Sequence, residues 1–286
     1  MDIILFNPLS KNGKAVETVL SLETDLQKQG NYVKSINILD VGDIDAFVAS
    51  LNYEDRVIIV GGDGTLHKLA NRIYHMGIKN EILMYGAGTG NDFVRSLRTK
   101  KKLISISKHL ENLPYALYNG KKERFLNGVG VGLDGLVCYK VNNSTEEKNS
   151  WNYFKNTIRA FRESKKFKTV EIEIDGKTEV YKNVWLSAFM NSQYLGGGMK
   201  MAPKARRTDR ELYMILVKRI PKFLVLFVLP SVYLGFHKIF AGVVKIVKIN
   251  EYAKVKYSVD GYMQADGEVE YPVSELEVHV YEKKEE

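Results

Sequence analysis

The sequence predicts two domains, an α/β domain with a parallel sheet followed by an antiparallel, β-sandwich-like domain. Up to about residue 119, short apolar strands alternate with helical patterns, which is typical of a parallel sheet. From residue 169 onward strand patterns dominate, and Asp175-Gly176 separates two of them as a hairpin turn would. We therefore expect a first domain at residues 1–119, a second at 120–276, and the active site in the cleft between them.

Three strands of the first domain end in loops of small or polar residues. Residues 3–6 lead into a loop starting at Asn7, residues 57–60 lead into Gly61, and residues 82–85 lead into Gly86. Apolar residues at helical spacing follow the loops. Because the carboxyl ends of parallel strands meet at one edge of a sheet, we expect these loops to lie side by side where α/β proteins bind ligands. Together they predict a nucleotide site.

The segment Gly61-Gly-Asp-Gly-Thr65 gives the sharpest local signal. Its glycines allow positive φ and a close approach of backbone N–H groups to an anion, and Thr65 is placed to start the next helix. A carboxylate at Asp63 would repel a phosphate, so its presence suggests a divalent cation between them. The alternative is that Asp63 simply caps the helix. Neither the Walker nor the Rossmann glycine spacing occurs.

In the second domain, the sequence predicts mostly strands, together with one or two helices. Residues 123–132 resemble a strand entering a glycine-rich bend, and residues 151–165 form an amphipathic helical pattern. The other strand patterns lie at residues 169–174, 179–189, 243–249, 253–259 and 278–281. The apolar stretch 223–229 is too short to cross a bilayer, so we expect either a core helix or an element lying at a membrane interface.

Four motifs carry a resemblance to a known family. In chain order they are Asn7-Pro8, Gly61-Gly-Asp-Gly-Thr65, Gly88-Thr-Gly-Asn-Asp92 and Asp266-Gly-Glu268. With these motifs, the chain resembles the bacterial diacylglycerol kinase-like lipid kinases, which share a catalytic domain with sphingosine kinases. The resemblance implies transfer of a phosphoryl group from ATP, with Mg²⁺, to a hydroxyl of a diacylglycerol-like lipid. It also implies that residues 277–286 can return to the first domain.

The resemblance assigns roles to individual residues. Phosphoryl transfer needs a phosphate cradle, a cation and a base, and the family's catalytic base falls on Glu268, with Asp63 and Asp134 in the magnesium network. The matching metal positions of a separate structural magnesium are Arg206, Asp209 and Glu211. The nucleotide-binding positions are Asn7, Pro8, Leu9, Ser10, Lys11, Gly61, Gly62, Asp63, Gly64, Thr65, Leu66, His67 and Thr89.

Two other functions remain open at this point. An NAD kinase also carries Gly-Gly-Asp-Gly-Thr, but the Asn-Glu pair of that group is replaced here by His67-Lys68, and Asp266-Gly-Glu268 favours the lipid branch. A non-catalytic nucleotide- or lipid-binding regulator is suggested by Lys11, which stands where the family usually has glycine. The retained carboxylates Asp63 and Glu268 argue against that reading.

Charge and cysteine content bound the environment and the partners. The formal charge is +8, and the lysine and arginine clusters are either solvated surface charge or sites that would attract anionic lipid by about 1 kcal/mol per cation near the surface. No nucleic-acid-binding signature accompanies the charge, so nucleic acid is not expected as a partner. The single cysteine, Cys138, excludes an internal disulfide. We expect a cytoplasmic protein on the inner membrane face, with no leader peptide and with a homodimer left open.

Overall fold

The first unit of the chain, Met1–Glu111, is an α/β domain built on a five-stranded sheet. The computed structural model describes every residue except 11–13, 75–76, 87–90, 145–149, 165 and 283–286. The strand order is β2-β1-β3-β4-β5, in which neighbouring strands are parallel except that β5 runs antiparallel to β4. The elements are β1 (Asp2–Phe6), α1 (Ala15–Lys28), β2 (Val33–Asn37), η2 (Ile38–Asp40), α2 (Ile44–Ala49), β3 (Arg56–Val60), α3 (Asp63–Ile73), β4 (Glu81–Tyr85), α4 (Asp92–Leu97), β5 (Leu103–Ser105) and α5 (Ser107–Leu110).

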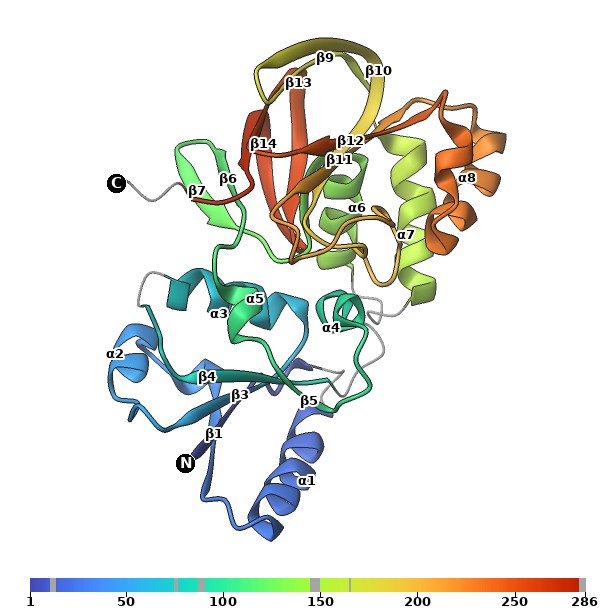
Figure 1. Ribbon diagram of the computed structural model, residues 1–286. Helices are drawn as coiled ribbons and strands as arrows, with labels where there is room; N and C mark the ends of the chain where they lie inside the picture. Colours follow the sequence, from blue (N-terminus) through green and yellow to red (C-terminus); the bar gives the residue numbers. More distant parts are fainter. Residues whose placement is uncertain (11–13, 75–76, 87–90, 145–149, 165, 283–286) are drawn as a thin grey trace. The chain divides into compact units, whose positions relative to one another are not determined.

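Helices cover both faces of this sheet, which explains why its central strands are apolar throughout. Helix α1 lies on one side of the sheet and α3 on the other (Figure 1). Ile4, Ile58 and Leu83 on the sheet pack in one cluster with Val19 and Leu22 of α1. Burial on both faces favours continuous β-branched and leucine runs over polar–apolar alternation. The three predicted strands at 3–6, 57–60 and 82–85 are therefore confirmed.

The second unit, Asn112–Glu286, is an antiparallel β domain. Its nine strands follow the order β12-β11-β10-β8-β13-β14-β6-β7, and β9 pairs with both β10 and β13. The elements are β6 (Tyr115–Tyr118), β7 (Lys121–Arg124), β8 (Gly128–Gly132), α6 (Leu133–Asn142), α7 (Ser150–Glu163), β9 (Phe167–Ile174), β10 (Lys177–Met190), β11 (Leu212–Lys218), α8 (Lys222–Leu234), η4 (His237–Phe240), β12 (Val244–Ile249), β13 (Tyr252–Ala265) and β14 (Glu268–His279).

Two long strands give this unit its sandwich-like form. One part of β10 pairs with β9 and the next part pairs with β8, and β13 is shared between the same two strands. Register shifts at Val184/Leu186 and Lys256/Gly261 mark the places where each long strand changes partner. Apolar residues from all of these strands form one core, with Phe189, Val255 and Met263 at its centre. The antiparallel β domain expected from the sequence is confirmed.

Local turn chemistry in this unit follows the sequence closely. Asp175 and Gly176 both have positive φ, as a two-residue hairpin turn requires, and they join β9 to β10.

The predicted helix at 151–165 is α7. Helix α8 runs through Pro230 and ends at Gly235, whose φ of 78° closes the helix in the left-handed conformation. Among the described residues no helix is both long and apolar enough to cross a membrane.

Three details differ from the expectations. The units divide between Glu111 and Asn112, not after residue 119, because β6 pairs with β14 in the second unit. Residues 277–279 are likewise paired within the second unit, with β6 and β13. Residues 128–132 form the strand β8, not a bend, because the glycines alternate with Val129 and Val131, which lie in the core.

Candidate active site

The loops after β1 and β3 lie together at the carboxyl edge of the first sheet. Asn7, at the end of β1, reaches Thr65 of α3 through a 3.4 Å contact between Asn7 Nδ2 and Thr65 Oγ1. Asn7 also shapes its own loop, since its Oδ1 accepts a hydrogen bond from the Leu9 backbone N–H at 3.0 Å. The structure thus brings two of the predicted phosphate loops together.

Gly61 is required for packing, and the expectation of positive φ in this loop was wrong. Neither Gly61 nor Gly62 is among the positive-φ glycines. A Cβ on Gly61 would instead lie 2.8 Å from the Thr65 Cβ, which is too close. Gly62 is the N-cap of α3 and has no side chain with which to cap it. No side chain at residue 62 therefore competes with an anion for the first N–H groups of this eleven-residue helix.

Asp63 holds the neighbouring helix α4. Its Oδ2 accepts the Asp92 N–H at 2.8 Å, and its Oδ1 accepts the Phe93 N–H at 3.0 Å. The predicted alternative had Asp63 capping its own helix, whereas the structure shows it bonded to the N-terminus of the next one. A carboxylate oxygen can accept more than one bond, so the residue can still face a cation. Asp63 therefore ties the second phosphate loop to the third.

In the second unit, Glu268 begins β14 at the end of a tightly held turn. Asp266, two residues earlier, is buried, and its carboxylate accepts hydrogen bonds from the N–H groups of Leu126, Asn127 and Gly128, the last two at 2.7 and 3.2 Å. Asp266 adopts a φ of 49°, and Gly267 one of 97°. This backbone is anchored to the start of β8, so the position of Glu268 is fixed by contacts far away in the sequence.

Gln264 connects this turn to Asp134. Its Oε1 accepts the Gly267 N–H at 3.1 Å, and its Nε2 donates to Asp134 Oδ2 at 3.2 Å. The other face of the turn is held by Asn142 of α6, whose Nδ2 donates to the Gly267 carbonyl at 2.9 Å. One buried amide thus links the Asp134 carboxylate to the turn that precedes Glu268.

The Asp134 carboxylate lies in a buried recess that exists because residue 130 is glycine. A Cβ at Gly130 would come within 2.1 Å of Asp134 Oδ2. Oδ1 of the same carboxylate is buried and has no hydrogen-bond partner in the described part of the chain. Burial raises the pKa of Asp134 to about 7, despite the hydrogen bond from Gln264, which lowers it. An orphaned buried oxygen of this kind fits a carboxylate that shares a cation or a proton during function.

A hydroxyl pair lies in the same part of the sheet. Ser187 Oγ and Tyr257 Oη are 2.6 Å apart and both are buried. Burial raises the pKa of the Tyr257 hydroxyl, Ser187 opposes that rise, and the charge of Asp134 adds to it. The cluster is therefore polar, buried and sensitive to the charge on Asp134.

Comparisons with known proteins agree with this arrangement. Residues 3–115 match the diacylglycerol kinase catalytic domain, and residues 127–280, more than half of the chain, match the YegS C-terminal NAD kinase beta sandwich-like domain. The chain belongs to the diacylglycerol kinase-like lipid kinase family. The family-level activity is that of a lipid kinase, and kinases of this family use ATP.

Individual members of the family are distant. A diacylglycerol kinase of Mycobacterium tuberculosis is 26% identical over 246 residues, covering 82% of this chain and 78% of its own. A diacylglycerol kinase of Staphylococcus saprophyticus is 26% identical over 227 residues, covering 76% and 72%. A crystal structure described as a diacylglycerol kinase from Bacillus anthracis covers 99% of this chain and 97% of its own, with a TM-score of 0.62 at 18% identity. That likeness shows the fold.

The remaining nucleotide-site predictions divide into three groups. Pro8, Leu9 and Ser10 follow Asn7 in the first loop, where Leu9 is exposed and the Ser10 N–H donates to the Asn7 carbonyl. Leu66 and His67 are buried in α3, so their side chains belong to the packing of the helix. Gly64 lies in the first turn of α3, while Lys11 and Thr89 fall outside the described residues.

The three residues of the predicted structural magnesium site are largely engaged with other groups. Glu211 Oε1 accepts the Tyr213 hydroxyl at 2.7 Å, and its Oε2 pairs with Lys248. These contacts outweigh burial, which by itself would raise the pKa, so the pKa of Glu211 is lowered. The Arg206 carbonyl accepts the Asp209 N–H at 3.1 Å. Glu211 does not fit as a free ligand, and no group of three or more His, Cys, Asp or Glu residues that could hold a metal occurs in the described ranges.

The sequence did not point to Gln264, Asn142 or Gly130. Gln264 and Asn142 act through contacts to residues more than 100 positions away, so their spacing carries no local signal. Gly130 had a signal: Gly128, Gly130 and Gly132 alternate along one face of a strand, which is the pattern of a face that must accept something close to the backbone.

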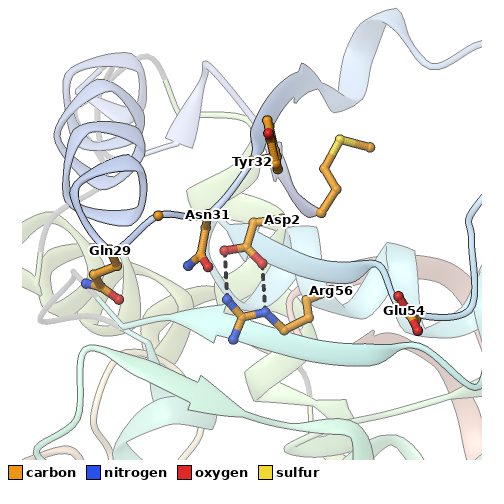
Figure 2. A pocket seen from close by; sticks show the side chains of 8 residues that line it. Asp2, Gln29, Asn31, Tyr32, Glu54 and Arg56 are labelled. Carbon is orange, nitrogen blue, oxygen red and sulfur yellow. Dashed lines mark hydrogen bonds and ion pairs between the residues drawn. The ribbon is translucent and has the colours of Figure 1, made fainter.

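A polar hollow lies at the opposite edge of the first sheet (Figure 2). It is lined by Met1, Gln29 and Tyr32 among others, and it contains a two-point ion pair in which Arg56 Nε and Nη2 each lie 2.7 Å from the Asp2 carboxylate. Asp2 and Arg56 begin β1 and β3, so this hollow lies at the amino ends of the strands. Its ion pair joins two neighbouring strands, and we assign it no catalytic role.

Proposed function

We propose that this member of the family is an ATP-dependent lipid kinase that phosphorylates a hydroxyl of a diacylglycerol-like lipid. The observation that carries the proposal is the link made by Gln264, which joins the turn bearing Glu268 to the recessed Asp134. A base must be held in a fixed position to accept a proton from an acceptor hydroxyl. The hydrogen bonds that the buried Asp266 carboxylate accepts from the backbone of residues 126–128 hold the turn in place.

The first unit supplies the nucleotide site in this proposal. The N-terminal amides of α3 would bind phosphate oxygens, with Asn7 and Thr65 beside them. Asp63 would keep the loops after β3 and β4 in register through its bonds to Asp92 and Phe93. Mg²⁺, when bound, would spread the negative charge of the phosphates, and Asp63 is the carboxylate of this unit that would hold it.

The chemical step is an exchange of phosphorus–oxygen bonds. Glu268 accepts the proton of the lipid hydroxyl as that oxygen bonds to the γ-phosphorus of ATP. The bond from the γ-phosphorus to the bridging oxygen breaks, and ADP leaves. Asp134 is a positioning residue for this step, since it contacts the turn only through Gln264.

The test is transfer of labelled γ-phosphate from ATP with Mg²⁺ to one of two acceptors. Diacylglycerol would be offered in anionic mixed micelles, and NAD would be offered separately. We expect label in phosphatidic acid and none in NADP. Label in NADP alone would contradict the proposal in favour of an NAD kinase, and ATP binding without transfer to either acceptor would contradict the diacylglycerol-like substrate.

A further inference from the structure

Four large apolar side chains are exposed within one short stretch of the second unit. Phe227 and Leu234 of α8 are 63% and 65% exposed, and Phe236 and Ile239, beside and within η4, are 63% and 75% exposed. We call these four residues the α8–η4 patch. Single exposed apolar residues are ordinary on protein surfaces, but four within thirteen consecutive residues need an explanation.

The opposite side of α8 is firmly packed, so the exposure is not that of a loose helix. Val228 and Leu229 are 7% and 8% exposed, and Val228 shares a core cluster with Trp185 and Ile220. Helix α8 therefore has an inner side held by the β domain and an outer side that carries aromatic and aliphatic residues. A helix that is apolar on its outer side as well as its inner side needs an apolar surface to cover that outer side.

The charge around the patch indicates what that boundary is. Residues 212–250 contain the cations Lys218, Arg219, Lys222, Lys238, Lys245 and Lys248 and no aspartate or glutamate. Lys245 pairs with Glu179 of β10, and Lys248 pairs with Glu211, the residue before β11. Lys218, Arg219 and Lys238 are exposed, and none of them pairs with a carboxylate in the described part of the chain. Lys238 lies between Phe236 and Ile239, so a cation stands within the patch itself.

We propose that the α8–η4 patch is the surface by which this protein binds an anionic lipid bilayer. Phe236 and Ile239 enter the boundary between headgroups and acyl chains, while Lys238 and the cations before α8 meet the anionic headgroups. A second protein chain would need acidic groups to match these cations, and another copy of this chain has none to offer from the same segment. The inference concerns lipid-surface binding and holds whether or not the proposed phosphoryl transfer occurs.

The experiment is vesicle co-sedimentation of the full chain without ATP. Vesicles of phosphatidylcholine alone are compared with vesicles containing phosphatidylglycerol. The variants are Phe236→Ser with Ile239→Ser, and Lys238→Glu; the matched controls are Val180→Ser, which is 60% exposed on β10, and Lys177→Glu on the same hairpin. We expect the apolar double variant to weaken partitioning onto anionic vesicles at least tenfold. Lys238→Glu should weaken it about fivefold at low salt and less at high salt.

A second readout guards against misfolding of the variants. Tryptophan placed at Ile239 should shift its emission to shorter wavelength when anionic vesicles are added, and tryptophan placed at Val180 should not. Equal binding by wild type, patch variants and controls would overturn the proposal, as would a failure of the wild type to bind vesicles. A change from dimer to monomer in the patch variants, with vesicle binding unchanged, would overturn it in favour of self-association.

Discussion

The two units hold their candidate functional residues in different ways. In the first unit, the Asp63 carboxylate accepts hydrogen bonds from the backbone N–H groups of Asp92 and Phe93. The groups that shape these loops are mostly backbone groups at the ends of neighbouring strands. In the second unit, the Asp266 carboxylate accepts hydrogen bonds from the backbone N–H groups of residues 126–128, and Gln264 and Asn142 join the turn to α6. The proposed nucleotide loops therefore depend on contacts between neighbouring loops, whereas the turn that bears the proposed base Glu268 depends on buried contacts between segments far apart in the sequence.

Gly130→Ala should produce the largest effect, because it fills the recess that holds Asp134. The added Cβ would lie 2.1 Å from Asp134 Oδ2 and 3.0 Å from the Ser187 carbonyl. We expect a loss of about 3 kcal/mol in unfolding free energy, together with a fall in phosphoryl transfer. Gly242→Ala is the matched control, since nothing lies within 4 Å of its Cβ position, and denaturant unfolding compares the two. Equal stability of the two variants would show that the recess is not tightly built.

Asp266→Asn should lower the unfolding free energy by about 2 kcal/mol, because it removes a buried, charged acceptor of hydrogen bonds from three N–H groups. Asp175→Asn is a close comparison. Asp175 has a similar φ of 48° and also accepts three backbone N–H groups, but it does so at an exposed hairpin. We expect Asp175→Asn to cost less than about 1 kcal/mol in the same unfolding measurement. A larger loss at Asp175 would contradict the role given to burial.

Asp134→Asn should stabilise the fold at high pH while lowering activity. Because burial raises the pKa of Asp134 to about 7, the folded state binds more protons than the unfolded state between about pH 4 and 7. Wild-type stability should therefore fall as the pH rises through this window. At pH 8 the variant should gain about 1 to 2 kcal/mol in unfolding free energy, less than the full shift implies, because Asp134 as a whole residue is only half-buried although its Oδ1 is buried. Thermal melts from pH 4 to 8 measure this, and parallel curves for both proteins would contradict it.

Asp63→Asn should have the smallest effect on stability, about 1 kcal/mol, because an asparagine can still accept one of the two α4 amides. Its effect on ATP binding should be larger, since the variant loses the charge proposed to face Mg²⁺. Asp43→Asn is the control in the same unit: Asp43 caps α2 by accepting the Asp45 and Ala46 N–H groups and lies in no phosphate loop. Calorimetry with ATP and Mg²⁺ distinguishes them, and equal affinities would remove Asp63 from the nucleotide site.

Residue patterns predicted the parts of the fold that are encoded locally. Apolar runs predicted the strands before the phosphate loops, and Asp175-Gly176 predicted the β9–β10 hairpin. The shift of partner within β10 and β13 and the Gln264 link could not be predicted, because they arise from pairing between distant segments. The glycine loop was identified for the wrong reason, since close packing against Thr65, not positive φ, requires Gly61. The catalytic and binding roles of the predicted residues stay predictions.

The most direct test of the account is a comparison of Glu268→Gln with Glu270→Gln. The two glutamates lie two residues apart on β14, and Glu270 pairs with Lys121 at 2.8 Å. We predict that Glu268→Gln lowers phosphoryl transfer to diacylglycerol by about 10²-fold or more while ATP affinity and melting temperature stay unchanged. Glu270→Gln should retain wild-type turnover. Wild-type turnover in Glu268→Gln, or an equal loss in both variants, would contradict the assignment of Glu268 as the base.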